Sequence, residues 1–128
     1  MKALKIEPTE LSPEVLLDPK ENKFVISGES RPEEAREFYQ PILDWLDKYY
    51  SLRYWKDNKF GKNTEVVFEF KFEYFNSTSA KFILDILNKI ERFRKENIDI
   101  KVKWYYDEPD LGYEGVRRSI RQNGRYSF

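Results

Sequence analysis

The chain contains neither cysteine nor histidine in its 128 residues. These absences exclude a thiolate nucleophile, a disulfide, a Cys/His zinc site and a Ser-His-Asp triad, because each needs one of the two side chains. Glycine is scarce too, and its five residues are scattered without forming a glycine-rich phosphate loop. We therefore expect a protein that is not an enzyme and that holds no cofactor or metal ion.

Long apolar runs are also missing. No segment approaches the roughly 20 apolar residues that span a bilayer, and residues 1–6 lack the apolar run of a signal peptide. The absence of cysteine fits a reducing compartment. We therefore expect a cytoplasmic protein.

The residues that are present favour one folded domain. Hydrophobic residues make up 40% of the sequence and aromatic residues 17%, while charged residues reach 36% and cancel to a net charge of zero. Disordered chains usually have few aromatic residues and a large net charge. The length suits a single domain, residues 1–128, whose core is built largely from aromatic rings.

Several apolar stretches have the pattern of β-strands. Residues 15–17 and 24–26 are short apolar runs separated by turn-forming residues, which predicts a hairpin, and residues 4–6 are expected to add an edge strand. Residues 66–74 and 98–106 alternate between apolar and mostly charged side chains, as strands with one buried face do. The buried face of the first is expected to carry Val66, Phe68, Phe70, Phe72 and Tyr74.

Two long helices are expected between these strands. The first is predicted to begin at Ser30, whose spacing to Glu33 is that of a capping box, with Pro32 in the first turn. Apolar residues then recur at helical spacing, although Pro41 should kink or split this helix. The second helix is expected to follow residues 76–79.

The order strand, helix, strand over residues 66–106 predicts a parallel pair with a right-handed crossover. Residues 51–63 have no period and are expected to be a connection. Val116 and Ile120 are expected in a short third helix, with a final strand at residues 126–128. The fold predicted from these elements is a single α/β domain with a mixed sheet of four to six strands and two long helices.

An acidic cluster follows the last long strand, at Asp107, Glu108 and Asp110. Carboxylate oxygens bind hard cations, and a carboxylate-based enzyme would have to use this cluster. Its spacing matches no EF-hand, and Pro109 indicates a loop. We therefore interpret the cluster as solvated surface.

The segment Asn76-Ser77-Thr78-Ser79 lies where a strand passes into a helix. Such side chains are good N-caps, and most clusters of this kind only cap. The unpaired N–H groups and the dipole at a helix start also favour an anion, so a phosphoryl group with a charge of roughly −1.5 to −2 would be tolerated there. From the residues alone, a cap and a phosphorylation switch both remain open.

Family resemblance favours the switch. Residues 43–46 (LDWL), 72–87 (FEYFNSTSAKFILDIL) and 102–106 (VKWYY), with the opening pattern over residues 6–30, resemble the SiaC family of bacterial regulatory phosphoproteins. The resemblance covers residues 3–107, and residues 108–128 form a divergent, basic tail.

The resemblance implies a fold like that of the anti-sigma-factor antagonists of the STAS type, and a partner-switching cycle. A dedicated kinase phosphorylates a hydroxyl after the Asn, and a PP2C-type phosphatase removes the phosphate. The unphosphorylated form binds and activates a diguanylate cyclase, which links it to cyclic-di-GMP and biofilm formation. The implied acceptor is Ser77, with Thr78 as the alternative, and partner contacts are expected at Asn76, Thr78, Ser79 and Lys81.

A single-stranded nucleic-acid-binding module is the main alternative. Basic and aromatic residues alternate in the 51–63 segment, and the tail is rich in arginine. Such a surface would stack bases and contact phosphates. The residues proposed for this role are Arg53, Trp55, Lys59, Arg117, Arg118 and Arg121.

Overall fold

The structure, a computed structural model, describes residues 1–60, 65–96, 98–109 and 118–125, and the side chains of residues 1–53, 65–96 and 98–105. Strands and helices follow in one order along this part of the chain. They are β1 (Leu4–Ile6), β2 (Glu14–Asp18), β3 (Lys23–Ser30), α1 (Ala35–Phe60), β4 (Val66–Phe75), α2 (Ser77–Lys95), β5 (Ile100–Pro109) and β6 (Arg118–Arg125).

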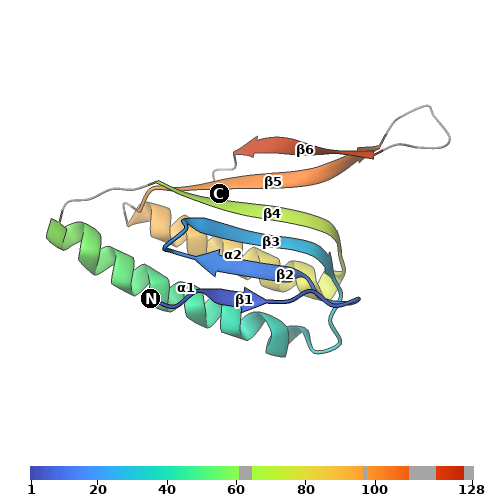
Figure 1. Cartoon of the computed structure of the whole chain (residues 1–128), viewed down its shortest axis with the longest axis horizontal. Coiled ribbons are helices and arrows are strands. Elements are labelled where there is room, and N and C mark those ends of the chain that lie inside the picture. Colours follow the sequence, from blue (N-terminus) through green and yellow to red (C-terminus); the bar gives the residue numbers. More distant parts are fainter. Residues whose placement is uncertain (61–64, 97, 110–117, 126–128) are drawn as a thin grey trace.

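The strands form one six-stranded sheet in the order β1-β2-β3-β4-β5-β6. The central pairs β3/β4 and β4/β5 are parallel, and the other three pairs are antiparallel. The predicted hairpin, the edge strand and the parallel pair are therefore confirmed, as is the mixed α/β sheet with two long helices. Both helices lie on the same side of the sheet, so the strands show their other face in Figure 1.

The core lies between the sheet and the two helices and is rich in stacked rings. Phe24, on β3, packs against Phe68 at a centroid distance of 6.1 Å. Phe68 in turn stacks on Phe70 at 5.0 Å. On the helix side, Tyr39 stacks on Phe82 at 5.6 Å, which joins α1 to α2. Burying rings of this size supplies much of the driving force for folding.

A β-bulge near the end of β4 changes the predicted facing of its last residues. Gly28 pairs with Phe72 and Glu29 with Tyr74, so β4 has one residue more than β3 at this point. The alternation therefore shifts by one, and the prediction that Tyr74 lies on the buried face is wrong, since it is 51% exposed. Gly28 has φ +106°, which a glycine adopts without the steric cost of a Cβ atom.

The start of α1 also differs from the prediction. Ser30 is the last residue of β3 and is fully buried, and α1 begins five residues later, at Ala35. The predicted capping box at Ser30 and Glu33 therefore does not form. The side chain of Ser30 makes tertiary hydrogen bonds with Tyr39 and Ser79 instead.

Helix α1 is longer than predicted. It is not split at Pro41, and it includes residues 51–60, which were expected to be a connection. Pro41 has no N–H to donate to the carbonyl of Glu37, four residues earlier. Both residues are exposed, so water can hydrate that carbonyl. On the opposite face of α1, the buried Ile42 and Leu46 hold this helix against the sheet.

The last described elements also correct the sequence analysis. Ile120 was expected in a third helix, but it lies in β6 and pairs there with Asp107 of β5. The hairpin with β6 extends β5 to Pro109, so Asp107 and Glu108 belong to a strand and not to a loop. The predictions for Asp110, Val116 and residues 126–128 fall outside the described residues.

Candidate functional site

The strand-to-helix corner, residues 76–81, is built around Asn76. Its backbone is extended (φ −86°, ψ 177°), and its side-chain Oδ1 accepts a hydrogen bond from the backbone N–H of Ser79 at 2.8 Å. Its carbonyl accepts from the N–H of Ala80 at 2.9 Å. Asn76 is therefore the N-cap of α2, and the helix begins at Ser77.

The three hydroxyl side chains of the corner have different environments. Ser77 and Thr78 are exposed, whereas Ser79 is completely buried. Lys81 is exposed and Asn76 is half-buried. Four of the five residues named from the sequence therefore reach the surface together, and the side chain of Ser79 does not.

Ser79 lies in a buried group of hydroxyls that joins three elements. Its Oγ donates to the carbonyl oxygen of Ser30 at 3.0 Å and accepts from the Oγ of Ser30 at 2.9 Å. The Oγ of Ser30 also bonds the hydroxyl of Tyr39 on α1. Burial raises the pKa of the Tyr39 phenol, and the nearby hydroxyls of Ser30 and Ser79 oppose part of that rise.

The electrostatics of the corner favour an anion at its surface. The first turn of α2 contains no acidic residue, so no carboxylate on the helix balances the positive end of its dipole. The last turn contains Arg92, Arg94 and Lys95, which balance the negative end. A phosphoryl group on Ser77 or Thr78 would meet a favourable local field.

Exposed apolar side chains surround the corner, and sequence reasoning missed them. Tyr74 and Phe75, which lead into the corner, are 51% and 36% exposed, and Leu84 on α2 is 54% exposed. Leu84 follows Ser77 by seven residues, two helical turns, and so lies on the same helix face. The sequence did contain a signal that Leu84 is exposed, because this leucine falls outside the apolar stripe of α2.

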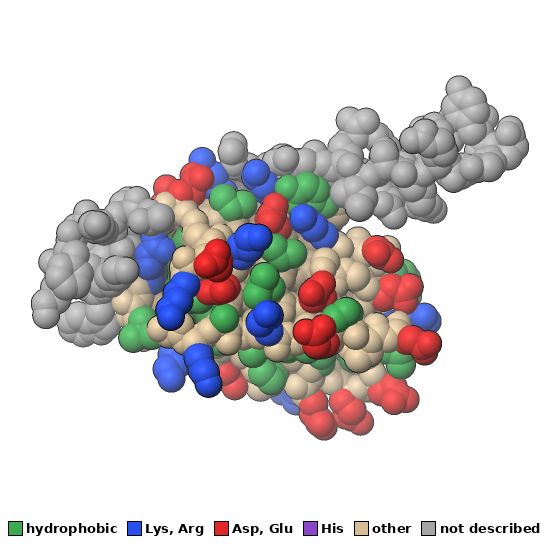
Figure 2. Space-filling model, in the orientation of Figure 1, with side chains coloured by type: hydrophobic (Ala, Val, Ile, Leu, Met, Phe, Trp, Pro, Cys, Tyr) green, Lys and Arg blue, Asp and Glu red, His purple; other side chains and the backbone are tan. Residues whose placement is uncertain are grey.

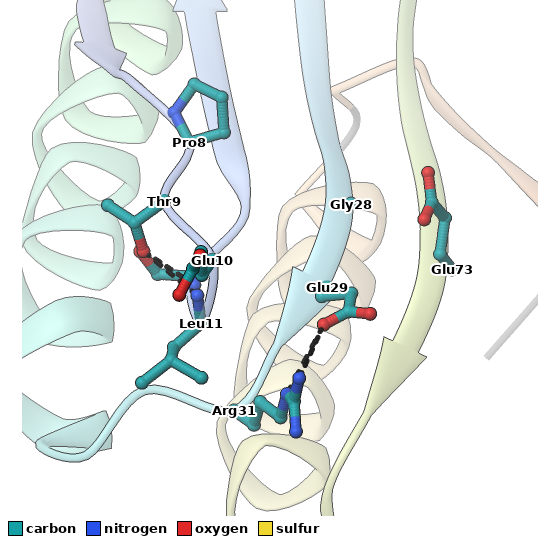
Figure 3. A pocket seen from close by; sticks show the side chains of 9 residues that line it. Pro8, Thr9, Glu10, Leu11, Gly28, Glu29, Arg31 and Glu73 are labelled. Atoms are coloured by element: carbon teal, nitrogen blue, oxygen red, sulfur yellow. Dashed lines mark hydrogen bonds and ion pairs between the residues drawn. The ribbon is translucent and has the colours of Figure 1, made fainter.

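An open pocket lies beside the corner, on the uncovered side of the sheet (Figure 3). Glu29 and Arg31, the two neighbours of Ser30, line it and form an ion pair at 3.2 Å. Glu10 and Glu73 add two further carboxylates. Among the described residues, no group of three or more His, Cys, Asp and Glu side chains is arranged to hold a metal ion.

The uncovered face of the sheet has a mixed surface. Figure 2 shows acidic, basic and hydrophobic side chains interspersed over the strands. On this face Tyr105 donates a hydrogen bond to Glu69 at 2.9 Å, and the ammonium group of Lys71 lies 4.9 Å from the centroid of the Tyr105 ring. These contacts are local pairs between neighbouring side chains, and they do not make an extended patch of one charge.

The residues of the nucleic-acid alternative are only partly described. Arg53 lies in α1 and donates a hydrogen bond to the Tyr49 hydroxyl at 2.8 Å. The side chains of Trp55, Lys59, Arg118 and Arg121 fall outside the described ones, as do all atoms of Arg117. The same holds for the side chains of the acidic cluster at residues 107–110.

Comparisons with known proteins agree with one another. The family model described as SiaC family regulatory phosphoprotein matches residues 6–121. An uncharacterized protein of Pseudomonas aeruginosa (strain UCBPP-PA14) is 20% identical over 128 residues, which are 100% of this chain and 94% of that protein.

Solved structures of similar fold come from the same species. Apo-SiaC from Pseudomonas aeruginosa superposes with a TM-score of 0.69 at 21% identity, covering 81% of this chain and 78% of that one. The diguanylate cyclase SiaD in complex with its activator SiaC gives a TM-score of 0.64 at 20% identity, covering 77% and 74%. Among the described residues, neither helix has an apolar stretch of the length that a membrane span requires.

Proposed function

Since the chain belongs to the SiaC family of regulatory phosphoproteins, we propose that it is a partner-switching regulator controlled by phosphorylation of Ser77. Its unphosphorylated form binds and activates a diguanylate cyclase, and a phosphate on Ser77 blocks this binding. A protein kinase adds the phosphate and a PP2C-type phosphatase removes it. The choice of effector is supported by the relative SiaC, which is an activator of the cyclase SiaD.

The exposure of Ser77 at the first position of α2 is the observation that carries this proposal. A kinase needs a hydroxyl that it can reach, and Ser79 is completely buried. Thr78 is also exposed and remains the alternative acceptor. Asn76 keeps its capping role with either acceptor, because its Oδ1 bonds a backbone N–H and not a hydroxyl.

The switch would act by electrostatics and desolvation. The helix start tolerates a dianion while it is solvated, but burying that dianion in an interface removes its hydration. Moving a partner from mostly bound to mostly free requires a difference of about 3–5 kcal/mol, which a dianion inside an interface can supply. The phosphate therefore disturbs docking more than it disturbs folding.

The docking surface in this proposal consists of the exposed residues around Ser77. Asn76, Thr78 and Lys81 supply polar contacts, and Tyr74, Phe75 and Leu84 supply apolar area. Ser79 is not part of this surface, because its side chain has no exposed area. Interfaces typically combine an apolar centre with a polar rim, which these residues provide.

The test uses a serine/threonine kinase and a diguanylate cyclase from the same genome. Peptide mass spectrometry locates the phosphate, and cyclic-di-GMP production measures activation of the cyclase. Ser77→Ala should prevent phosphorylation and still activate the cyclase, while Thr78→Ala, the matched control, should be phosphorylated normally. Phosphate on Thr78 alone would move the acceptor by one residue. A protein that neither accepts phosphate at this corner nor binds a cyclase would refute the proposal.

A further inference from the structure

We propose that Tyr39 and Ser30 are positioning residues for the corner. Together with Ser79 they form a buried hydroxyl chain that fixes the first turn of α2, so that a kinase meets Ser77 and Thr78 but not Ser79. The inference deepens the proposed function and rests on it for the identity of the modification. Its structural part, the fixing of the first turn, stands without any kinase.

The direction of each hydrogen bond in this chain follows from counting protons. The hydroxyl of Ser79 donates to the carbonyl of Ser30, so its oxygen is left to accept from the hydroxyl of Ser30. The single proton of Ser30 is then used, and its oxygen accepts from Tyr39. The order of donation is therefore Tyr39 to Ser30 to Ser79, ending at the Ser30 carbonyl.

The chain ends on the carbonyl that also holds the corner. The carbonyl of Ser30 accepts a second hydrogen bond, from the backbone N–H of Asn76 at 3.0 Å. Asn76 is the N-cap and directly precedes Ser77. Two hydrogen bonds to the Ser30 carbonyl thus fix Asn76, directly before Ser77, and Ser79, two residues after it.

Burial makes this arrangement selective. Ser30, Tyr39 and Ser79 are each 0% exposed, so a broken link leaves a polar group without water as a replacement partner. The stack of Tyr39 on Phe82, with an interplanar angle of 2°, holds the phenol in place from α2 itself. Ser79 can reach a kinase only if the first turn leaves β3, and the chain opposes that motion.

The structural test is hydrogen exchange measured by NMR on the amides of Asn76, Ser79 and Ala80. Tyr39→Phe removes the first donor and keeps the ring, so these amides should exchange about fivefold to tenfold faster, as expected when one net hydrogen bond is lost. Ser30→Ala breaks the same chain at its centre and should have the larger effect. Ile90→Val, a buried substitution further along α2, serves as the control for a general loss of stability.

The selectivity test removes the exposed acceptors. In Ser77→Ala/Thr78→Ala protein, Ser79 is the remaining hydroxyl of the corner, and the kinase that modifies the wild type should leave it unmodified. Adding Tyr39→Phe should make Ser79 phosphorylation measurable by mass spectrometry, and adding Ile90→Val should not.

The outcomes separate this inference from the proposed function. If the wild type takes no phosphate at Ser77 or Thr78, the proposed function fails, while the exchange rates still decide whether the chain fixes the corner. If Tyr39→Phe and Ser30→Ala leave the exchange of the three amides no faster than Ile90→Val does, the inference is overturned. It is also overturned if Ser79 is phosphorylated with the hydroxyl chain intact.

Discussion

The hydroxyl of Ser79 donates a hydrogen bond to the backbone carbonyl of Ser30, 49 positions earlier in the chain and 3.0 Å away. This bond ties the first turn of α2 to the end of β3, next to the residue that caps the helix. Because both residues are fully buried, water cannot replace either partner. The corner is therefore a tertiary feature and not only a local cap.

Loss of the N-cap should weaken the fold measurably. Asn76→Ala removes the acceptor of the Ser79 N–H, and the free energy of unfolding should fall by about 1 kcal/mol. Urea denaturation followed by circular dichroism measures the change. Asn88→Ala, an exposed position in the middle of α2, should leave stability unchanged or slightly higher, since alanine is the better helix former. Equal losses in both variants would contradict the capping role.

A negative charge at Ser77, the phosphate acceptor, should stabilise the folded state and weaken partner binding. Ser77→Asp places a carboxylate in a first turn that has none, so the free energy of unfolding should rise by about 0.3–1 kcal/mol and the gain should shrink with added salt. Cyclase binding should weaken at the same time. Asn88→Asp, in the middle of the same helix, should give no such gain. A destabilised Ser77→Asp protein would argue against an anion-tolerant helix start.

Tyr39 should make stability depend on alkaline pH. Burial raises the pKa of its phenol above the ordinary 10.0, so the folded state prefers the neutral form. The stability that this preference supplies is complete below the unfolded pKa and is lost as pH rises through the folded pKa.

The measurement compares wild type with Tyr39→Phe in urea denaturation between about pH 8 and about pH 11. The advantage of wild type should be constant at the lower end of this range and shrink above the ordinary phenol pKa. Both proteins contain Tyr105, whose pKa burial also raises, so the difference between them isolates Tyr39. A difference that stays constant over the whole range would contradict the assignment.

Leu84 should contribute to partner binding without contributing much to stability. It is 54% exposed, so Leu84→Gln should change the free energy of unfolding by no more than about 0.5 kcal/mol. Affinity for the cyclase should fall about tenfold, because an apolar contact near the acceptor is lost. Isothermal titration calorimetry measures the affinity.

Leu52→Gln is the matched control for Leu84→Gln. Leu52 is 49% exposed, close to the 54% of Leu84. It lies about 25 Å along α1 from Ala35, which is the end of that helix nearest the corner. Its substitution should leave cyclase affinity unchanged. Equal effects at both leucines would place the docking surface elsewhere.

The elements with a strong period could be predicted from the sequence. Val66, Phe68, Phe70 and Phe72 alternate with mostly charged residues, and all four are buried in β4 as expected. The stripe of Phe82, Ile83, Ile86 and Ile90 likewise marks the buried face of α2. These predictions hold because the side-chain period of a strand or helix is a property of its own backbone.

The failures share a different cause, which is competition from distant parts of the chain. Tyr74 left the buried face because a bulge opposite Gly28 shifted the alternation. Ser30 had the spacing of an N-cap, but Tyr39 and Ser79 compete for its hydroxyl. Of the two outcomes expected at Pro41, a kink or a split, the split does not occur, because the buried Ile42 and Leu46 hold α1 together on its core side.

The sequence by itself determined the corner, since Asn76 followed by three hydroxyl residues specifies a helix start where an anion is tolerated. It even contained a signal that Ser79 faces inward, because this serine shares the helical stripe of Phe82, Ile83 and Ile86. Only the tertiary structure decided what Ser79 meets there. Its partners lie on β3 and α1, and contacts between residues so far apart along the chain are set by packing and not by local periodicity.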